Sequence, residues 1–306
     1  MKPGRSSKTA EHNALFRALE ARRPVGDRVT EDLLAERLLS WRFRLVTAGA
    51  RWRAWRDGVL RFIDHRWPGV RPTVLARTRL IDEMIIEIVP STPQLVILGA
   101  GLDTRAWRLP GLDDVALFEV DHPATQRRKE VLLRRGGLDL RRVRFIPTDF
   151  NLGRLRGAMA ETGFDPTLPT LFLWEGTTNY LSAEAVDETL RWCARSTPGS
   201  HLVFTYINAD VLVDPSRYVG ADRVFSTVRR ANEPMTFGLA PDAIAEYVAE
   251  RGLQLVSDEG AAAFRERCFG ASSHMMHGHE FYRIAHACIT PTPTRPPERD
   301  SVAPRP

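Results

Sequence analysis

The chain has few cysteines and no long apolar run, and both shortages limit what it can be. Its three cysteines, Cys193, Cys268 and Cys288, are an odd number at wide spacing, which indicates reduced thiols rather than a disulfide framework or a metal cluster. No segment approaches the roughly 18 consecutive apolar residues that cross a bilayer, and the first residues lack the apolar core of a secretion signal. We therefore expect a soluble, cytoplasmic protein with no membrane partner.

Acidic residues are outnumbered, with 43 Lys and Arg against 38 Asp and Glu, so the formal net charge is +5. Such an excess can indicate nucleic-acid binding. The arginines are spread over two expected helices, around residues 51–66 and 127–142, as on solvated helix faces. The tryptophans at positions 41, 52, 55 and 67 are expected to pack in a helical core, with the lining of an acceptor pocket as the alternative. We expect no nucleic-acid partner, although a non-catalytic nucleic-acid or partner-binding module remains the alternative of another class.

The two ends of the chain carry little apolar periodicity. Residues 1–26 are polar and rich in small residues, and residues 290–306 are rich in proline, so both predict poorly ordered segments. Helical periodicity between residues 27 and 92 predicts a helical N-terminal cap.

The centre of the chain alternates strands and helices. Expected strands at 94–98, 115–121, 143–147, 170–174 and 201–206 alternate with helices near 123–135, 151–162 and 182–195. This order predicts an α/β domain over residues 93–289 with a doubly wound parallel sheet. The polar stretch 207–239 is interpreted as an inserted lid, and segments 253–256 and 280–289 as an antiparallel pair at the sheet edge.

One glycine-rich turn carries the functional signal. The apolar run Leu95 to Leu98 ends at Gly99-Ala100-Gly101, and the next expected strand ends with Glu119 and Asp121. An acid at the end of the second strand can accept hydrogen bonds from ribose hydroxyls, which predicts a nucleotide-cofactor site. Alternation places both acids on one face, so their spacing does not choose between them.

The third glycine of the dinucleotide pattern is missing, because Thr104 occupies its place. A pyrophosphate on the following helix is therefore disfavoured, and a cofactor with one nucleoside and no phosphate, such as S-adenosylmethionine, fits better. An NAD-dependent dehydrogenase is the competing enzyme hypothesis.

Three strings in order, LGAGLDTRAWRLP, FEVDHP and WEGTTNYL, resemble the leucine carboxyl methyltransferase family, in particular its bacterial branch of S-adenosylmethionine-dependent O-methyltransferases. The resemblance covers about residues 73–204. It implies a seven-stranded class I (Rossmann-like) sheet with a reversed last strand, and methyl transfer to an oxygen of a small-molecule acceptor by in-line displacement.

The resemblance also implies roles for seven residues. Arg77, with Arg79 as the neighbouring possibility, holds the carboxylate of the cofactor. Gly99 and Gly101 lie beside its methionine moiety, Asp121 binds the ribose, Asp149 and Phe150 bind the adenine, and Glu175 lies near the amino group. Thr177-Thr178-Asn179 stand where many relatives have leucine, which leaves the acceptor open.

A carboxylate is the acceptor favoured by family analogy. It is ionised at neutral pH and needs no general base, so no catalytic residue is assigned. If the acceptor is instead a phenol or alcohol, His122 is the base to test, and Tyr180 is the other candidate. The histidines at 274, 277 and 279 lack a second ligand cluster, so no metal is expected.

Overall fold

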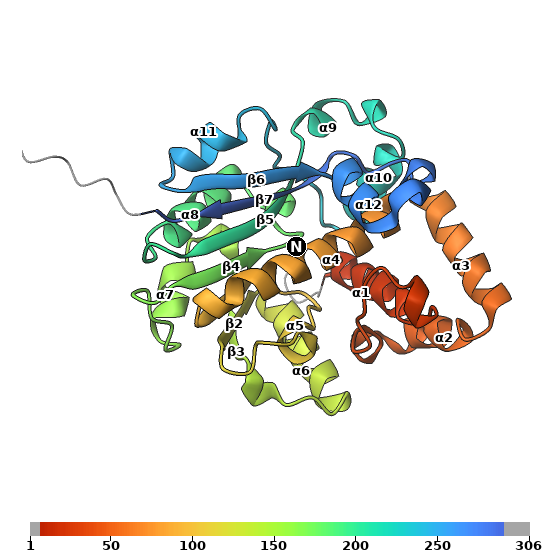
Figure 1. Cartoon of the computed structure of the whole chain (residues 1–306), viewed down its shortest axis with the longest axis horizontal. Coiled ribbons are helices and arrows are strands. Elements are labelled where there is room, and N and C mark those ends of the chain that lie inside the picture. The colour runs from red at the N-terminus through yellow and green to blue at the C-terminus, as the bar shows by residue number, and fades with distance from the viewer. Residues whose placement is uncertain (1–6, 291–306) are drawn as a thin grey trace, which may run out of the picture.

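The computed structural model describes residues 7–290 (Figure 1), so the predicted disordered tail lies outside the described residues except for Thr290. A seven-stranded sheet forms the centre, with the order β3-β2-β1-β4-β5-β7-β6. The strands are β1 (Gln94–Leu98), β2 (Ala116–Asp121), β3 (Arg144–Pro147), β4 (Thr170–Trp174), β5 (His201–Ile207), β6 (Gln254–Gly260) and β7 (Tyr282–Cys288). Strand β7 runs antiparallel to both of its neighbours, whereas the other pairs are parallel. The predicted sheet and its reversed last strand are confirmed.

Helices cover both faces of this sheet. One face packs against α4 (Val70–Ile88) and α12 (Ala261–Phe269), and the other against α7 (Leu155–Ala160), α8 (Ala183–Cys193) and α11 (Ile244–Ala249). All residues of β1 and β4 are buried, which is why those strands read as unbroken apolar runs. Helix α4 packs on the sheet and contributes to its core. It therefore belongs structurally to the sheet domain, although the sequence analysis assigned it to the N-terminal cap of residues 27–92.

The strand order reverses between β1 and β4. Strands β1 to β3 extend to one side of this point, and β4 to β7 extend to the other. Loops that follow β1 and β4 therefore part in opposite directions, which leaves a crevice at their carboxyl ends. Helices α5 (Arg105–Arg108) and α6 (Pro123–Arg135) follow β1 and β2 at this edge.

The first residues are more ordered than the sequence suggested. Residues 8–20 form helix α1 (Lys8–Glu20), so the prediction of a poorly ordered segment up to residue 26 is wrong for this part. Ser7 caps the helix by accepting a hydrogen bond from the backbone N–H of Ala10 at 3.1 Å. Leu15 and Leu19 are buried against α4 and the short helix η2 (Ala35–Leu38). Their spacing of four residues is a helical signal hidden between polar neighbours.

Helices α2 (Trp41–Gly49) and α3 (Arg53–Arg66) follow each other through a short turn at the outer edge of the molecule, with α2 beside α1 and α3 at an angle to α2 (Figure 1). This pair of helices is called the hairpin below. Thr47 is the buried residue of α2, and Ile63 is that of α3. Trp41, Trp52 and Trp55 are exposed, so the expectation that they pack in a core is wrong. The segment 207–239 is largely helical, with α9 (Asp210–Val213) and α10 (Ala221–Arg230).

Candidate functional site

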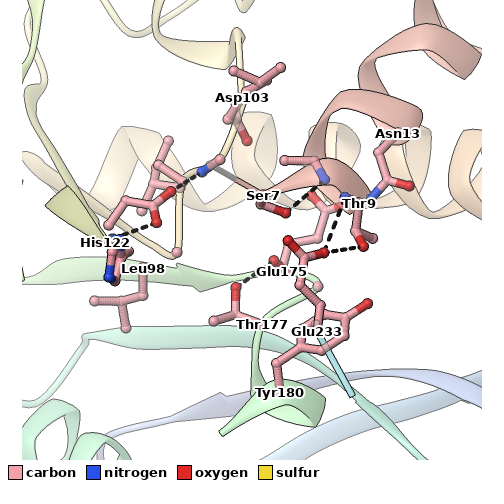
Figure 2. Close-up of a pocket in the computed structure, with 18 of the residues that line it drawn as sticks. Ser7, Thr9, Asn13, Leu98, Asp103, His122, Glu175, Thr177, Tyr180 and Glu233 are labelled. Carbon is pink, nitrogen blue, oxygen red and sulfur yellow. Dashed lines mark hydrogen bonds between the residues drawn. The ribbon is translucent and has the colours of Figure 1, made fainter. Parts of the chain in front are cut away.

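A cavity of about 250 Å³ opens at the carboxyl ends of β1, β2 and β4. Its far side is closed by α1, through Ser7, Thr9 and Asn13, and by Glu233 from the predicted lid segment (Figure 2). Nine of the residues that the sequence singled out line this cavity: Arg77, Gly99, Gly101, Asp121, His122, Asp149, Phe150, Glu175 and Tyr180. Arg79 does not, because it lies exposed on α4 and pairs with Glu83 at 2.8 Å. The structure therefore places Arg77, rather than Arg79, at the cavity.

Asp121 and Glu119, which the sequence could not separate, have different environments. Asp121 accepts hydrogen bonds from the backbone N–H groups of Gly101 and His122, each at 2.5 Å, and lines the cavity. Glu119 is buried away from the cavity and pairs with Lys129 at 2.6 Å. Burial raises the pKa of Asp121 to about 6. Asp121 is thus the acid available to a ligand.

The two glycines of the turn are in close contact with other segments of the protein. Both have positive φ angles, 68° at Gly99 and 51° at Gly101. A Cβ atom at Gly99 would lie 2.1 Å from Oγ1 of Thr177, and one at Gly101 would lie 3.2 Å from the Cβ of Ala10. The sequence interpretation, that these glycines let the backbone approach a ligand, therefore leaves out the contacts with the β4 loop and with α1.

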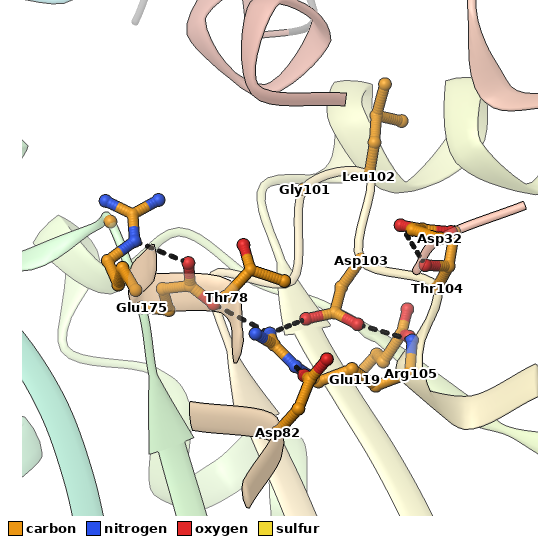
Figure 3. A network of polar contacts seen from close by, with 12 residues as sticks. Asp32, Thr78, Asp82, Gly101, Leu102, Asp103, Thr104, Arg105, Glu119 and Glu175 are labelled. Atoms are coloured by element: carbon orange, nitrogen blue, oxygen red, sulfur yellow. Dashed lines mark hydrogen bonds and ion pairs between the residues drawn. The ribbon is translucent and has the colours of Figure 1, made fainter. Parts of the chain in front are cut away.

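An ion-pair network joins α4, the glycine turn and the end of β4 (Figure 3). Glu175 accepts from Nε of Arg77 at 2.6 Å and from Nη1 of Arg105 at 2.7 Å. Arg105 also donates to Asp82 at 2.6 Å and to Asp103 at 2.5 Å. Burial by itself raises the pKa of Glu175, but Arg105 and Arg77 outweigh it and lower the pKa to about 2. Glu175 is therefore held as a carboxylate.

The network continues toward the N-terminal helices. Asp32 accepts from Nε of Arg17 at 2.8 Å and from Oγ1 of Thr104 at 2.6 Å. Thr104, at the position where a dinucleotide site has glycine or alanine, is thus buried and donates its hydroxyl hydrogen to Asp32. Helix α5, which follows Thr104, has only four residues. So short a helix offers little dipole to a pyrophosphate.

Asp149 and Phe150 occupy the loop after β3. Asp149 caps the short helix η5 (Phe150–Leu152), accepting from the backbone N–H of Asn151 at 3.0 Å. Phe150 is buried with its ring centroid 6.1 Å from that of Trp174. Both residues still line the cavity, so the capping role does not remove Asp149 from it.

The two candidate bases lie in unfavourable places. His122 is the N-cap of α6, and its Nδ1 accepts from the backbone N–H of Ala124 at 3.2 Å. Burial raises the pKa of the Tyr180 hydroxyl, which keeps this group neutral. Tyr180 can therefore donate or accept a hydrogen bond but is a poor proton acceptor in catalysis.

A second, smaller cavity of about 80 Å³ adjoins the first. The two share Thr9, Asn13, Arg77, Gly176 and Tyr180. The second cavity is lined largely by apolar and aromatic side chains, among them Phe16, Trp67, Val74, Val228 and Tyr282. Its charged lining residues within the described part of the chain are Lys8 and Arg77, with no Asp or Glu. The second cavity is thus largely apolar, with two basic side chains in its wall.

Sequence reasoning missed several residues of the site. Thr9 and Asn13 lie on the helix that was expected to be poorly ordered. Glu233, in the predicted lid segment, accepts from the backbone N–H groups of Lys8 and Thr9 at 3.0 and 3.2 Å, which ties α1 to that segment. Arg105 lies within a recognised motif, but its role depends on partners that are distant in sequence. No group of three or more His, Cys, Asp or Glu that could hold a metal occurs among residues 7–290.

The lining of the first cavity fits the polar groups of S-adenosylmethionine. Five acids, Asp103, Asp121, Asp149, Glu175 and Glu233, suit a cationic ligand with ribose hydroxyls and an amino group. Arg77, 3% exposed, uses Nε on Glu175, and neither Nη atom has a hydrogen-bond partner among the described residues. Two guanidinium nitrogens therefore remain to donate to a carboxylate.

The reversed β7 and the cavity at the carboxyl ends of β1, β2 and β4 are the arrangement of the class I methyltransferase fold. A family model described as leucine carboxyl methyltransferase matches residues 10–194. The chain belongs to this family. No helix among the described residues is long and apolar enough to span a membrane.

Individual relatives agree with this assignment. The chain is 32% identical over 232 residues to a Streptomyces coelicolor protein named "Putative S-adenosyl-L-methionine-dependent methyltransferase", covering 68% of this chain and 71% of that one. It is also 32% identical over 191 residues to a Mycobacterium tuberculosis protein of the same name. That match covers 58% of this chain and 60% of the length of the relative.

Two solved structures share the fold. One is a DUF574 family protein from Streptomyces avermitilis, with a TM-score of 0.59, 16% identity, and coverage of 93% of this chain and 98% of that one. The other is described as a putative methyltransferase from Thermobifida fusca, with a TM-score of 0.60, 14% identity, and coverage of 95% and 97%. At this level of identity they bear on the fold alone.

Proposed function

We propose that the protein transfers the methyl group of S-adenosylmethionine to the carboxylate of a small apolar acid. The observation that carries this proposal is the pair of adjoining cavities. The first is rich in acids and fits the cofactor, and the second is apolar, with Lys8 and Arg77 as its charges. An apolar acid has the chemistry that the second cavity complements.

The cofactor roles follow the lining of the first cavity. Asp121 accepts from the ribose hydroxyls, and Glu175 faces the amino group with its charge fixed by two arginines. Arg77 offers its free donors to the cofactor carboxylate, while Asp149 and Phe150 hold the adenine. S-adenosylmethionine supplies a methyl group bonded to a positively charged sulfur, which is reactive toward an oxygen anion.

The residues of the acceptor cavity work by placement and by exclusion of water. An acceptor carboxylate is already ionised, so no residue has to remove a proton. Lys8 supplies positive charge toward it, and Tyr180 lies at the shared wall as a neutral hydrogen-bonding group. Such alignment contributes about 7–11 kcal/mol to a barrier in favourable cases. Segment 207–239, whose α10 lines the acceptor cavity, is the proposed lid.

A second candidate acceptor, a phenol or alcohol, is favoured by His12. This histidine lines the acceptor cavity, whereas His122 does not, and its ring lies 6.0 Å from that of Trp67. Its nitrogens make no hydrogen bond to the described residues. Burial lowers the pKa of the imidazole, against the opposing charges of Glu11 and Glu233. A neutral imidazole in this place could accept the proton of a hydroxyl group.

Methyl-labelled S-adenosylmethionine, offered with matched pairs of apolar acids and phenols, tests both candidates. A carboxylate acceptor gives an ester that releases labelled methanol in alkali, whereas a phenol gives an ether that survives. We expect alkali-labile product, and His12→Gln and His122→Gln should both retain activity. Alkali-stable product that is lost in His12→Gln would overturn the carboxylate in favour of the hydroxyl. No transfer to any member of either series would count against the proposed acceptor class.

A further inference from the structure

The helical hairpin of α2 and α3 presents a surface that the proposed reaction does not use. Five large apolar side chains on it are between 51% and 67% exposed: Trp41, Leu45, Trp52, Trp55 and Phe62. Trp41 and Leu45 are four residues apart on α2, while Trp52, Trp55 and Phe62 follow helical spacing along α3, so each helix gathers its set on one face. We call these five residues the aromatic face.

The two helices form a continuous unit. Nε1 of Trp55 donates to the backbone oxygen of Val46 at 3.3 Å, and the Trp55 ring lies over Gly49, where a Cβ would approach it to 2.6 Å. The hairpin thus extends outward as one piece, and its aromatic face has no cover among the described residues.

Positive charge is concentrated on the same hairpin. Residues 41–62 contain six arginines and one acid, Asp57, so the segment carries a formal charge of +5, equal to that of the whole chain. Arg42 and Arg51 lie over the rings of Trp41 and Trp52, at 5.5 and 4.7 Å. Arg44, Arg53 and Arg61 are exposed, and their side chains have no hydrogen-bond or ion-pair partner among the described residues. The sequence analysis described the arginines as spread over two helices, whereas the net positive charge of the chain is concentrated in residues 41–62.

We propose that this aromatic face docks the protein onto an anionic lipid surface. Tryptophan, phenylalanine and leucine interleaved with arginine suit the boundary between headgroups and acyl chains, and the charge complements an acidic leaflet. A second copy of the chain is disfavoured, because it would bring two faces of +5 together. The proposal departs from the expectation of no membrane partner, which rested on spanning segments, and it does not depend on the proposed reaction.

The position of the hairpin gives the docking a consequence for the acceptor. Phe43 of α2 and Trp67, which follows α3, both contact the His12 ring, at 5.7 and 6.0 Å between centroids. His12 and Trp67 line the acceptor cavity. A membrane-docked hairpin would therefore hold this cavity near the source of an apolar acid that partitions into lipid.

Flotation with vesicles tests the docking. We expect the full chain to bind vesicles of phosphatidylglycerol and phosphatidylcholine, and to bind pure phosphatidylcholine at least about tenfold less. Trp41→Ala/Phe62→Ala and the charge reversal Arg44→Glu/Arg53→Glu/Arg61→Glu should each lower binding at least tenfold. S-adenosylmethionine affinity and the melting temperature report whether these variants remain folded.

Matched controls separate docking from general charge. Arg127→Glu/Arg154→Glu/Arg156→Glu changes the net charge equally outside the hairpin, and Val213→Ala/Met275→Ala trims exposed apolar groups elsewhere. Both should bind vesicles like the unmodified chain. Failure of the unmodified chain to bind, or equal loss in the controls, overturns the proposal. A self-association that Trp41→Ala/Phe62→Ala abolishes, or a preference for single-stranded oligonucleotides over vesicles, assigns the face to another partner.

Discussion

Replacing Asp121 by alanine is the sharpest test of the cofactor site. Each carboxylate oxygen accepts from one backbone N–H group, that of Gly101 or that of His122, and Asp121 lines the cavity. Loss of a charge-assisted hydrogen bond to the ribose costs about 1.5–3 kcal/mol. The dissociation constant of S-adenosylmethionine should therefore rise by about 10- to 150-fold.

The same substitution removes the acceptor for two N–H groups of the glycine turn. Each such group that is left buried and unpaired costs about 1–3 kcal/mol, so the variant should also melt at a lower temperature. Calorimetric titration with S-adenosylmethionine is therefore performed well below the measured melting temperature.

A matched control lies two residues upstream. Glu119→Gln/Lys129→Met removes an acid from the same strand together with its buried partner, without touching the cavity. Removing both members of a buried pair avoids leaving one charge uncompensated. This control should bind S-adenosylmethionine like the unmodified protein. Our reasoning is refuted if folded Asp121→Ala binds with unchanged affinity, or if the control weakens binding equally.

Three further outcomes follow from the same contacts. Because the pKa of Asp121 is about 6 and its charged form accepts from ribose, S-adenosylmethionine affinity should fall as the pH drops through about 6; a flat profile in calorimetry between pH 5 and 8 would contradict this. Arg105→Met leaves buried Asp103 without its ion-pair partner, although Glu175 keeps Arg77 and Asp82 keeps Arg108. This variant should lower the free energy of unfolding in urea by about 3–5 kcal/mol, whereas exposed Arg156→Met should leave it unchanged. Gly99→Ala should lower the melting temperature more than Gly137→Ala, which also has a positive φ but open space around it; equal losses would show that the contact with Thr177 is unimportant.

The sequence by itself determined the sheet and most of the proposed cofactor site. Buried parallel strands appear as unbroken apolar runs because both faces are covered, and a Gly-Ala-Gly turn followed by an acid at the next strand end is a local pattern. Each of these features occupies a short stretch of chain. The motifs also placed Arg77, Asp149 and Glu175 at the same cavity before any contact was known.

Only the tertiary structure decided which charges act together and what closes the site. Asp121 and Glu119 share a strand face, and only the approach of Lys129 and of the glycine turn separates their environments. Helix α1 is held by burial of Leu15 and Leu19 and by Glu233, more than 200 residues away in the chain. Hydrogen bonds and burial between distant segments leave no periodic trace in sequence, because they depend on which surfaces the fold brings into contact.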